Sequence, residues 1–326
     1  MNILITGGAG YIGSITNWYL KSKGHRTVIF DNLQNGHKEA IGETELIVGD
    51  LQKKEDIQAV FASHQFDAVI HFAALALAGE SMEKPYEYYY NNIVGGMHLL
   101  EVMREGNCKT IIFSSTCAVY GFPKDLPVTE QSPIAPASVY GASKRNFEEI
   151  LGWYEKIYGI RYGALRYFNA CGALPDGSLG EAHNVETHII PIALQATQQE
   201  HPTFPVFGSD YQTSDGTCIR DYIHVLDLAD AHLKAVEVLT GKPDSFAVNL
   251  GVGKGYSNLE ILHAVEEVTG KKISVVNKPR RWGDPDAIWA DNTKAKELLG
   301  WTPQYTSIAS IIETAWKWHE KHPKGY

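Results

Sequence analysis

The sequence predicts an α/β protein in which helices cover both faces of a doubly wound, Rossmann-like parallel sheet. Short apolar runs alternate with longer segments of helical pattern, and a glycine-rich turn directly follows the first run. A chain of 326 residues is long enough for this sheet and a smaller mixed α/β domain. The runs expected to form strands lie at 2–6, 26–31, 45–48, 68–72, 110–113, 160–165 and 246–250.

The first turn has the spacing of a dinucleotide-binding loop. NILIT is followed by GGAGYIG, in which Gly7, Gly10 and Gly13 lead into a helix-compatible stretch. Glycines let the backbone approach a pyrophosphate, and a helix N-terminus offers it free N–H groups. Asp31 ends the second run, 18 residues after Gly13. Its carboxylate would accept hydrogen bonds from a ribose diol and repel a 2′-phosphate, so the sequence favours NAD over NADP.

Further ligand loops are expected after the next strands. In a doubly wound sheet, ligands bind at the carboxyl ends of the strands. Those ends here carry Asp50-Leu51, Phe72-Ala73 and Ser114-Ser115-Thr116. His71 lies inside its run, and we expect it to be a packed core residue.

A tyrosine and a lysine in YGASK suggest proton transfer. On a helix, Tyr140 and Lys144 would share one face. A phenol with a pKa of ~10 is only about 0.1% ionised at neutral pH, which handicaps it as a base by roughly 4 kcal/mol. A positive charge ~4 Å away contributes about 4 kcal/mol at an effective dielectric constant of ~20. Lys144, helped by an oxidised nicotinamide, therefore suits Tyr140 to carry a proton to and from a hydroxyl group.

Composition changes after Tyr167, where FNACGALPDGSLGEAHN is rich in glycine and proline. Long loops in compact proteins usually carry function. We therefore predict an NAD-binding Rossmann domain at 1–168, with segments near 220–250 returning to its sheet. Residues 169–326 are predicted to form mainly a substrate-binding domain.

The net charge and the N-terminal sequence limit the partners and the cellular location that we expect for the protein. A formal net charge of −9 argues against a broad nucleic-acid-binding face. MNILITGGAG lacks the charged start and apolar length of a signal peptide, and no run approaches the length of a transmembrane helix. We expect a cytoplasmic enzyme that binds neither nucleic acid nor membrane.

The cysteines lack paired spacing, so they predict reduced thiols rather than a disulfide framework or a zinc site. No metal is expected. The four cysteines are Cys108, Cys117, Cys171 and Cys218.

With these features together, the chain resembles the extended short-chain dehydrogenase/reductases and, among them, the UDP-galactose 4-epimerases. The resemblance covers essentially the whole length. It is carried by ordered blocks that include TGGAGYIGS, FDNLQNG, VIHFAA, GESMEKPYEYYYNN, IIFSSTCAVYG, YGASK, LRYFNACGA, VFGSDYQTSDGTCIRDYIHVLDLADAH and PRRWGDPD.

The resemblance implies a role for each matching residue. The family's catalytic trio corresponds to Thr116, Tyr140 and Lys144. The residues that would surround NAD are Gly7, Gly10, Tyr11, Ile12, Gly13, Asp31, Asn32, Asp50, Leu51, Phe72, Ala73, Asn91 and Phe168, with Tyr140 and Lys144. The residues that would contact the UDP-sugar are Thr116, Asn169, His188, Val206, Phe207, Arg220, Arg281, Asp284 and Ile288. The arginines also make independent sense, because a diphosphate calls for charged, forked donors.

Three positions depart from the family pattern. Ala76 stands where well-studied relatives carry a lysine near the cofactor phosphates. His188 stands where an amide is common, and Ile288 stands where some relatives have a bulky tyrosine beside the sugar's 2-substituent. A smaller wall at Ile288 would admit an N-acetyl group.

The resemblance implies interconversion of UDP-galactose and UDP-glucose by transient oxidation at carbon 4 with tightly bound NAD. Similar 4,6-dehydratases carry an Asp-Glu pair directly after the threonine, and related decarboxylases use a glutamate nearby. Here Cys117 and Ala118 follow Thr116, which favours epimerisation. The alternatives are a UDP-N-acetylglucosamine or UDP-pentose 4-epimerase, another NAD-dependent nucleotide-sugar dehydrogenase, or a nucleotide-sensing regulator. The UDP-matching arginines argue against a plain dehydrogenase, and the complete trio argues against a sensor.

Two segments predict the assembly. Residues 80–105 and 138–158 have helical pattern and carry apolar residues on more than one face. In the family these helices pair with their copies in a second subunit, so the resemblance implies a homodimer.

Overall fold

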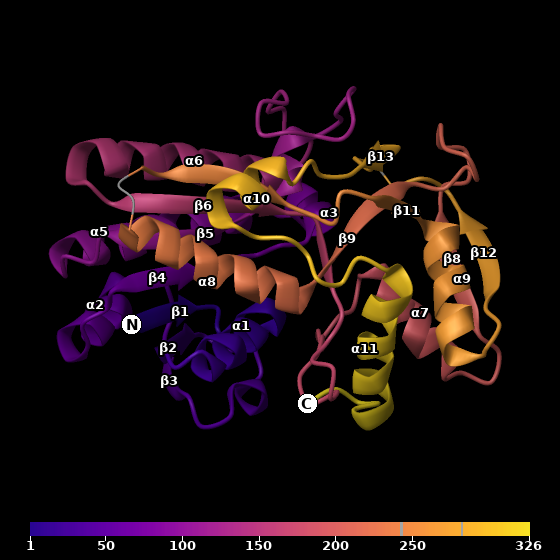
Figure 1. Cartoon of the computed structure of the whole chain (residues 1–326), viewed down its shortest axis with the longest axis horizontal. Coiled ribbons are helices and arrows are strands. Elements are labelled where there is room, and N and C mark those ends of the chain that lie inside the picture. Colours follow the sequence, from indigo (N-terminus) through magenta and orange to yellow (C-terminus); the bar gives the residue numbers. More distant parts are fainter. Residues whose placement is uncertain (242–243, 282) are drawn as a thin grey trace.

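The computed structural model describes residues 1–241, 244–281 and 283–326. Its main sheet has seven parallel strands in the order β10-β6-β5-β4-β1-β2-β3, which confirms the predicted doubly wound sheet (Figure 1). The strands are β1 (Asn2–Thr6), β2 (Arg26–Asp31), β3 (Glu45–Val48), β4 (Ala68–His71), β5 (Thr110–Thr116), β6 (Arg161–Tyr167) and β10 (Phe246–Leu250).

Helices cover both faces of this sheet. One face packs against α1 (Tyr11–Ser22), α8 (Val225–Gly241) and α10 (Thr293–Leu299). The other packs against α2 (Lys54–Ser63), α5 (Gly96–Glu105) and α6 (Val139–Tyr158). The short helices α3 (Ala78–Glu83) and α4 (Pro85–Tyr89) contact α6, and 3₁₀ turns occupy η1 (Lys38–Ile41) and η3 (Cys117–Tyr120).

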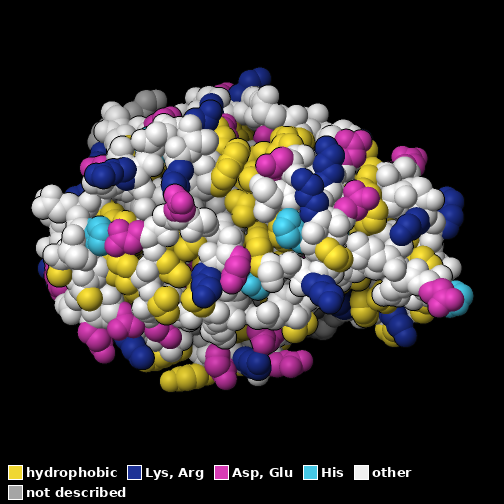
Figure 2. Space-filling model, turned by 90° about the horizontal axis from the view of Figure 1, so that it is seen from below, with side chains coloured by type: hydrophobic (Ala, Val, Ile, Leu, Met, Phe, Trp, Pro, Cys, Tyr) yellow, Lys and Arg dark blue, Asp and Glu magenta, His cyan; other side chains and the backbone are white. Residues whose placement is uncertain are grey.

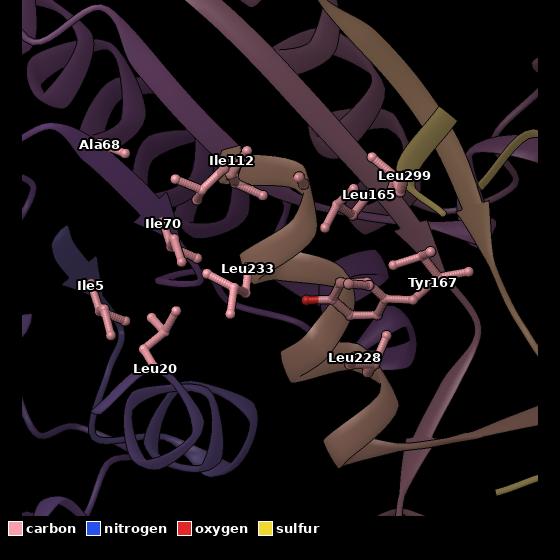
Figure 3. Packing of buried hydrophobic residues seen from close by; sticks show 14 of the residues in the cluster. Ile5, Leu20, Ala68, Ile70, Ile112, Leu165, Tyr167, Leu228, Leu233 and Leu299 are labelled. Atoms are coloured by element: carbon pink, nitrogen blue, oxygen red, sulfur yellow. The ribbon is translucent and has the colours of Figure 1, made fainter. Parts of the chain in front are cut away.

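Strand β1 shows how the two cores form. Ile3 and Ile5 join the cluster beside α1 and α8, whereas Leu4 joins the cluster on the opposite face. Figure 3 shows Ile5 with Leu20 and Leu233 in the first of these clusters. Because successive side chains of a strand point to opposite faces, one unbroken apolar run stabilises both layers.

The segment expected to be helical over 80–105 is interrupted. Helix α3 ends before Lys84, α4 begins at Pro85, and a π-helical segment, η2 (Tyr90–Gly95), leads into α5. Lys84 has φ −124° and ψ 54°. The proline ring disfavours helical backbone at the preceding residue, which explains the break at Lys84.

The smaller part of the molecule lies to the right in Figure 1. Its small sheet contains β7 (Asn169–Cys171), β9 (Ile219–His224), β11 (Gly255–Ser257) and β13 (Ala287–Ile288), and a separate pair contains β8 (Thr203–Phe207) and β12 (Ser274–Lys278). Three helices pack together beside them: α7 (Ile189–Thr197), α9 (Asn258–Thr269) and α11 (Ile308–Lys321). In the region near 220–250, α8 and β10 belong to the main layers, whereas β9 belongs to the small sheet.

The surface carries charges of both signs. On the face in Figure 2, Lys and Arg side chains are interspersed with Asp and Glu, and hydrophobic side chains line a strip between the two parts. Among the helices of the described ranges, none combines the length and apolar character needed to cross a membrane.

Candidate functional site

The glycine turn lies at the sheet's switch point, where β1 is flanked by β2 and β4. Gly7 has φ +70°, and a Cβ there would lie 2.5 Å from the backbone nitrogen of Ala73. A Cβ at Gly13 would overlap the Gly7 carbonyl oxygen. Only glycine allows this close approach of backbones, and ligands of doubly wound sheets bind at such switch points.

The start of α1 and the end of β2 face this turn. Gly10 is the N-cap of α1 and has no side chain to satisfy the first N–H groups of the helix. Asp31 accepts hydrogen bonds from the backbone of Ala9 at 3.0 Å and Leu33 at 2.8 Å. A carboxylate has about four acceptor positions, so Asp31 keeps capacity for a ribose diol. This arrangement fits a dinucleotide, with its pyrophosphate at α1 and its adenosine at β2.

Other predicted cofactor residues follow the neighbouring strands. Asn32 directly follows β2 and accepts a hydrogen bond from the Gln34 backbone at 3.0 Å. Asp50 follows β3, and Asp50 and Asn91 are joined through Gln52, which donates from its backbone to Asp50 and from its side chain to Asn91. The Gln52 contacts join the loop after β3 to the segment before α5.

Apolar residues complete this surface. Leu51 is buried against the α2–α5 side of the core, and Phe72 packs against His232 with ring centroids 4.6 Å apart. Ile12 packs against the opposite core. Tyr11, beside it on α1, donates a hydrogen bond to the Gly172 carbonyl at 2.6 Å, which links α1 to the loop after β7.

The predicted catalytic side chains meet where β5 ends and α6 begins. Thr116 is the last residue of β5, while Tyr140 and Lys144 lie in the first two turns of α6. Ser138 caps this helix by accepting from the Gly141 backbone at 3.1 Å. The Lys144 ammonium lies 5.9 Å from the centre of the Tyr140 ring. The helical spacing therefore brings the two groups together as predicted.

Burial dominates the pKa values of this pair in the protein alone. Burial raises the pKa of the Tyr140 phenol to about 12, and a hydrogen bond with Thr116 offsets only part of this rise. Burial also lowers the pKa of Lys144 to about 7. The Lys144 ammonium donates to the Ser114 carbonyl at 2.8 Å. Desolvation thus dominates both pKa values in the protein alone. The expected lowering of the tyrosine pKa by Lys144 together with an oxidised nicotinamide stays a prediction.

A buried ion pair supports the catalytic strand from behind. Arg166 on β6 forms a two-pronged interaction with Glu148 on α6, at 2.8 and 2.5 Å. Ser115 donates to the same carboxylate at 2.6 Å. Because Ser115 precedes Thr116, and Glu148 lies one turn after Lys144, this network fixes β5 and α6 relative to each other.

The predicted diphosphate-binding residues of the smaller part form one group, called here the arginine group, which consists of Arg220, Arg281 and Asp284. Asp284 lies 3.4 Å from the Arg220 guanidinium and 3.3 Å from that of Arg281. Arg281 also lies over the Phe207 ring, 5.1 Å from its centre. One guanidinium nitrogen of Arg220 is buried without a hydrogen-bond partner among the described residues. Two arginines that share one carboxylate leave positive charge for an anion.

The sugar-side residues lie next to this group. The register of β13 and β9 places Ile288 beside Arg220. Ile288 and Phe168 belong to the same buried cluster, and Arg220 lies close enough to Cys117 for its charge to lower the pKa of that thiol, although burial raises this pKa to about 12 overall. The arginine group and the catalytic strand are therefore neighbours.

Val206 and Asn169, two of the predicted UDP-sugar contacts, are already engaged within the protein. The Val206 side chain is fully buried among α7 and α9, so only its backbone can face a ligand. The Asn169 amide donates to the Asp221 carbonyl at 2.9 Å. The Asp221 carboxylate, which the sequence analysis missed, accepts from the backbones of Val252, Gly253 and Ala290. It positions β9 against the neighbouring loops, and only the three-dimensional structure brings those donors together.

His188 lies at the start of α7, in contact with two carboxylates of the preceding loop. It is the N-cap of α7, and its Nδ1 atom lies 2.9 Å from a carboxylate oxygen of both Glu181 and Glu186. These carboxylates raise the pKa of His188 to about 10, although burial acts in the opposite direction. A pocket lined by Asn169, Glu181 and His188, among others, connects this loop to β7.

Two further expectations are confirmed. The four cysteines are free thiols. His71 is buried, shares a 2.7 Å hydrogen bond with Thr6, and has its pKa lowered to about 3 by burial and by the charge of Lys144. It is a neutral core residue that joins the ends of β1 and β4.

Comparisons with known proteins identify the family of this chain. Residues 3–251 match the NAD dependent epimerase/dehydratase family. The UDP-glucose 4-epimerase of Streptococcus mutans is 49% identical over 329 residues, which cover 100% of this chain and 99% of that protein.

Solved structures give the same result. UDP-glucose 4-epimerase from Bifidobacterium longum, in complex with NAD+ and UDP, has a TM-score of 0.95 and 38% identity over 100% of both chains. The UDP-Glc/GlcNAc 4-epimerase of Campylobacter jejuni has a TM-score of 0.85 and 38% identity, covering 98% of this chain and 99% of that one. This chain therefore belongs to the NAD dependent epimerase/dehydratase family, whose cofactor is NAD.

Proposed function

We propose that this enzyme is a UDP-glucose 4-epimerase, which interconverts UDP-galactose and UDP-glucose. The observation that carries the proposal is the position of Thr116, Tyr140 and Lys144 beside the arginine group, with Cys117 and Ala118 in place of a second acid or base. A sugar oxidised at this site has no group to drive elimination or decarboxylation, so its return to an alcohol is the favoured outcome.

The residues divide the work as follows. Bound NAD supplies a reversible hydride acceptor and, when oxidised, a positive charge near the phenol. Tyr140 takes the proton of the sugar 4-hydroxyl, and Thr116 hydrogen-bonds that oxygen. Lys144 and the cofactor's charge bring the phenol into a range where it can act as a base. Arg220 and Arg281 would hold the diphosphate while the 4-keto sugar turns over and presents its other face for reduction. Tyr140 would then return the proton to the same 4-oxygen.

The same proposal assigns a ligand to each of the two parts of the chain. Residues 1–168, with α8 and β10, would bind NAD through the residues around the glycine turn, including Gly7, Gly13 and Asp31. Residues 169–326 would contribute most contacts to the UDP-sugar. The crowded backbones at Gly7 and Gly13 and the free acceptor capacity of Asp31 support the first assignment. The shared carboxylate of Asp284 supports the second.

The direct test is incubation of the purified protein with UDP-galactose, with and without added NAD, and chromatographic separation of the products. We expect UDP-glucose to accumulate to an equilibrium mixture without added NAD, because each turnover regenerates the cofactor. Conversion that depends on added NAD would keep the reaction but contradict tight retention, and Ala76 would be the first position to examine. Absence of conversion under both conditions would contradict the proposed reaction.

We also propose that the enzyme converts the N-acetylated pair, UDP-N-acetylglucosamine and UDP-N-acetylgalactosamine. Ile288 is buried beside Phe168 and Arg220 and is smaller than tyrosine. The Campylobacter jejuni relative acts on both kinds of sugar. Ile288→Tyr should lower kcat/KM for the N-acetyl sugars at least about 10-fold, with little effect on UDP-galactose. Ile288→Leu is the matched control of similar volume. Equal losses on both substrates would contradict the steric argument.

A cytoplasmic homodimer completes the proposal. Of the apolar residues in the two segments expected to pair, 80–105 and 138–158, the side chains of Tyr86, Tyr90, Met97 and Ile157 are exposed, with Tyr86 74% exposed. Leu100, which lies in the first of these segments, is buried in the core instead. An exposed aromatic and aliphatic group on packed helices is typical of a subunit interface. A monomeric mass by light scattering at micromolar concentration would contradict the dimer.

A further inference from the structure

A compact group of potential metal ligands lies in the loop before α7, outside the proposed catalytic residues. Within eight residues, the sequence EAHNVETH supplies two carboxylates and two imidazoles. One ligand atom from each side chain lies within 4.8 Å of all the others. The group, called here the loop cluster, consists of Glu181, His183, Glu186 and His188.

The distances in the loop cluster match a shared ion. The Nδ1 atom of His188 lies 2.9 Å from Glu181 and 2.9 Å from Glu186. The Nδ1 atom of His183 lies 3.1 Å from Glu186 and 3.4 Å from Glu181. Ligands bound to zinc at about 2.0–2.1 Å in a tetrahedron are separated by roughly 3.3 Å. Each imidazole therefore faces both carboxylates at the spacing of one coordination shell.

Hydrogen bonding alone does not satisfy these atoms. Each Nδ1 atom carries at most one proton, yet each faces two carboxylate oxygens. Both imidazoles have a hydrogen bond to Glu186. The buried Oε1 atom of Glu181 faces the same two Nδ1 atoms as Glu186, at 2.9 Å from His188 and 3.4 Å from His183, and makes no hydrogen bond of good geometry to the described residues. Glu181 itself is only 6% exposed. Two carboxylates that compete for the same two Nδ1 protons keep unfilled acceptor positions, which is costly for a buried oxygen, and a cation among the four side chains would fill them.

We propose that the loop cluster binds one Zn²⁺ ion. Imidazole nitrogen together with carboxylate oxygen suits zinc, whereas Mg²⁺ and Ca²⁺ prefer oxygen ligands alone. With both imidazoles neutral, the two carboxylates balance the charge of the ion. Four protein ligands form a closed shell, so the site is structural rather than catalytic.

The surroundings show what the ion would hold in place. The Glu181 carbonyl accepts a hydrogen bond from Trp318 on α11, and the Ala182 carbonyl contacts the His37 ring. His188 caps α7 at the other end of the loop. Zinc would therefore fasten the loop between β7 and α7, which the protein already ties to α11 and to the segment after β2.

The test measures metal rather than activity. The intact protein is dialysed against EDTA, equilibrated with ZnCl₂, desalted and analysed by inductively coupled plasma mass spectrometry. We expect about one zinc per chain, and no comparable retention of magnesium from MgCl₂. Glu181→Gln keeps the shape of the side chain but removes a charged ligand, and it should weaken zinc binding at least about 100-fold in competition with a chromophoric chelator.

The matched control is Glu313→Gln, an exposed carboxylate on α11 that should leave zinc binding unchanged. His183→Asn provides a second ligand variant should Glu181→Gln fail to fold, as judged by circular dichroism. Zinc should raise the melting temperature of the parent protein and not that of either ligand variant. Equal zinc retention by the parent protein and a folded ligand variant would overturn the proposal. Since no substrate is used, this result is independent of the proposed epimerase activity.

Discussion

In the main sheet the proposed ligand-binding residues follow the strands in chain order, whereas in the smaller part they come from distant, irregular segments. Gly7, Asp31, Asp50, Ala73 and Thr116 each end a strand or lie just beyond one. In the smaller part, the arginine group combines β9 with a loop after β12. In the main sheet, the rule that ligands bind at the carboxyl ends of the strands is enough to locate the proposed site. In the smaller part, the proposed site depends on side-chain contacts that form only in the folded chain.

The first prediction separates chemistry from binding in these two parts. Tyr140→Phe should lower kcat about 1000-fold, because the proton carrier is lost, and should leave NAD content and the KM for UDP-galactose nearly unchanged. Tyr154→Phe is the matched control. Tyr154 lies in the second half of α6, and its phenol donates a hydrogen bond to Glu101 on α5 at 2.7 Å. A variant that retains NAD and substrate binding but still turns over at the parent rate would contradict the role of Tyr140.

The second prediction concerns the ion pair behind the catalytic strand. Arg166→Met leaves the buried Glu148 carboxylate without its partner and should lower the free energy of unfolding by about 3–5 kcal/mol in urea titrations. The control is Glu149→Gln, which removes an ion pair with Arg145 at 2.8 Å on the surface. That change should cost less than about 1 kcal/mol. Similar losses in the two variants would show that burial does not set the strength of the pair.

The third prediction compares the two parts through pH. His71 in the main sheet and His224 in the small sheet each have a pKa of about 3, chiefly because burial disfavours the charged ring. A lowered pKa in the folded state means that this stability is complete above the unfolded pKa of ~6.5 and is lost as pH falls below it. At pH 5 each histidine should cost about 2 kcal/mol of unfolding free energy.

The measurement is the unfolding free energy of His71→Asn and His224→Asn from pH 7 to pH 5. Each variant should show a shallower decline than the parent protein, whatever its stability at pH 7. If only one variant shows the change, the two parts differ in how they exclude water. An unchanged slope in both would contradict neutral burial of these rings.

The smallest expected effect tests the crowded glycine turn. Gly13→Ala should cost about 1–3 kcal/mol of stability, because the new methyl group overlaps the Gly7 carbonyl, and it should also weaken NAD binding. Gly79→Ala is the control, since a Cβ there meets nothing within 4 Å and the residue lies in α3. It should be neutral or stabilising by up to about 1 kcal/mol. Equal behaviour of both variants, by thermal melting and NAD titration, would contradict the crowding.

The sequence predicted the main sheet and its ligand edge for a physical reason. Apolar runs mark buried strands, and the polar residues that follow them lie at one edge of the sheet. The spacing of Tyr140 and Lys144 likewise determines their common face. In the smaller part, Arg220 and Arg281 were identified only through the resemblance, because no periodic pattern relates residues 220 and 281.

Other features were beyond the sequence pattern. The raised pKa of Tyr140 follows from how deeply the helix start is buried, which spacing does not encode. The loop cluster was missed because its ligands were sought among cysteines, although the spacing Glu-x-His-x-x-Glu-x-His was present. Asp221 was missed because its three backbone donors come from segments that meet only in the folded chain.

The central claim is that carbon 4 is oxidised and then reduced within one bound complex, with Tyr140 moving only the hydroxyl proton. The most direct measurement is conversion of UDP-galactose in D₂O, followed by NMR or mass spectrometry of the UDP-glucose formed. We predict that carbon 4 of the product keeps its original hydrogen, because the hydride never exchanges with solvent. Deuterium at carbon 4 would contradict the account, since it would require removal of that hydrogen as a proton.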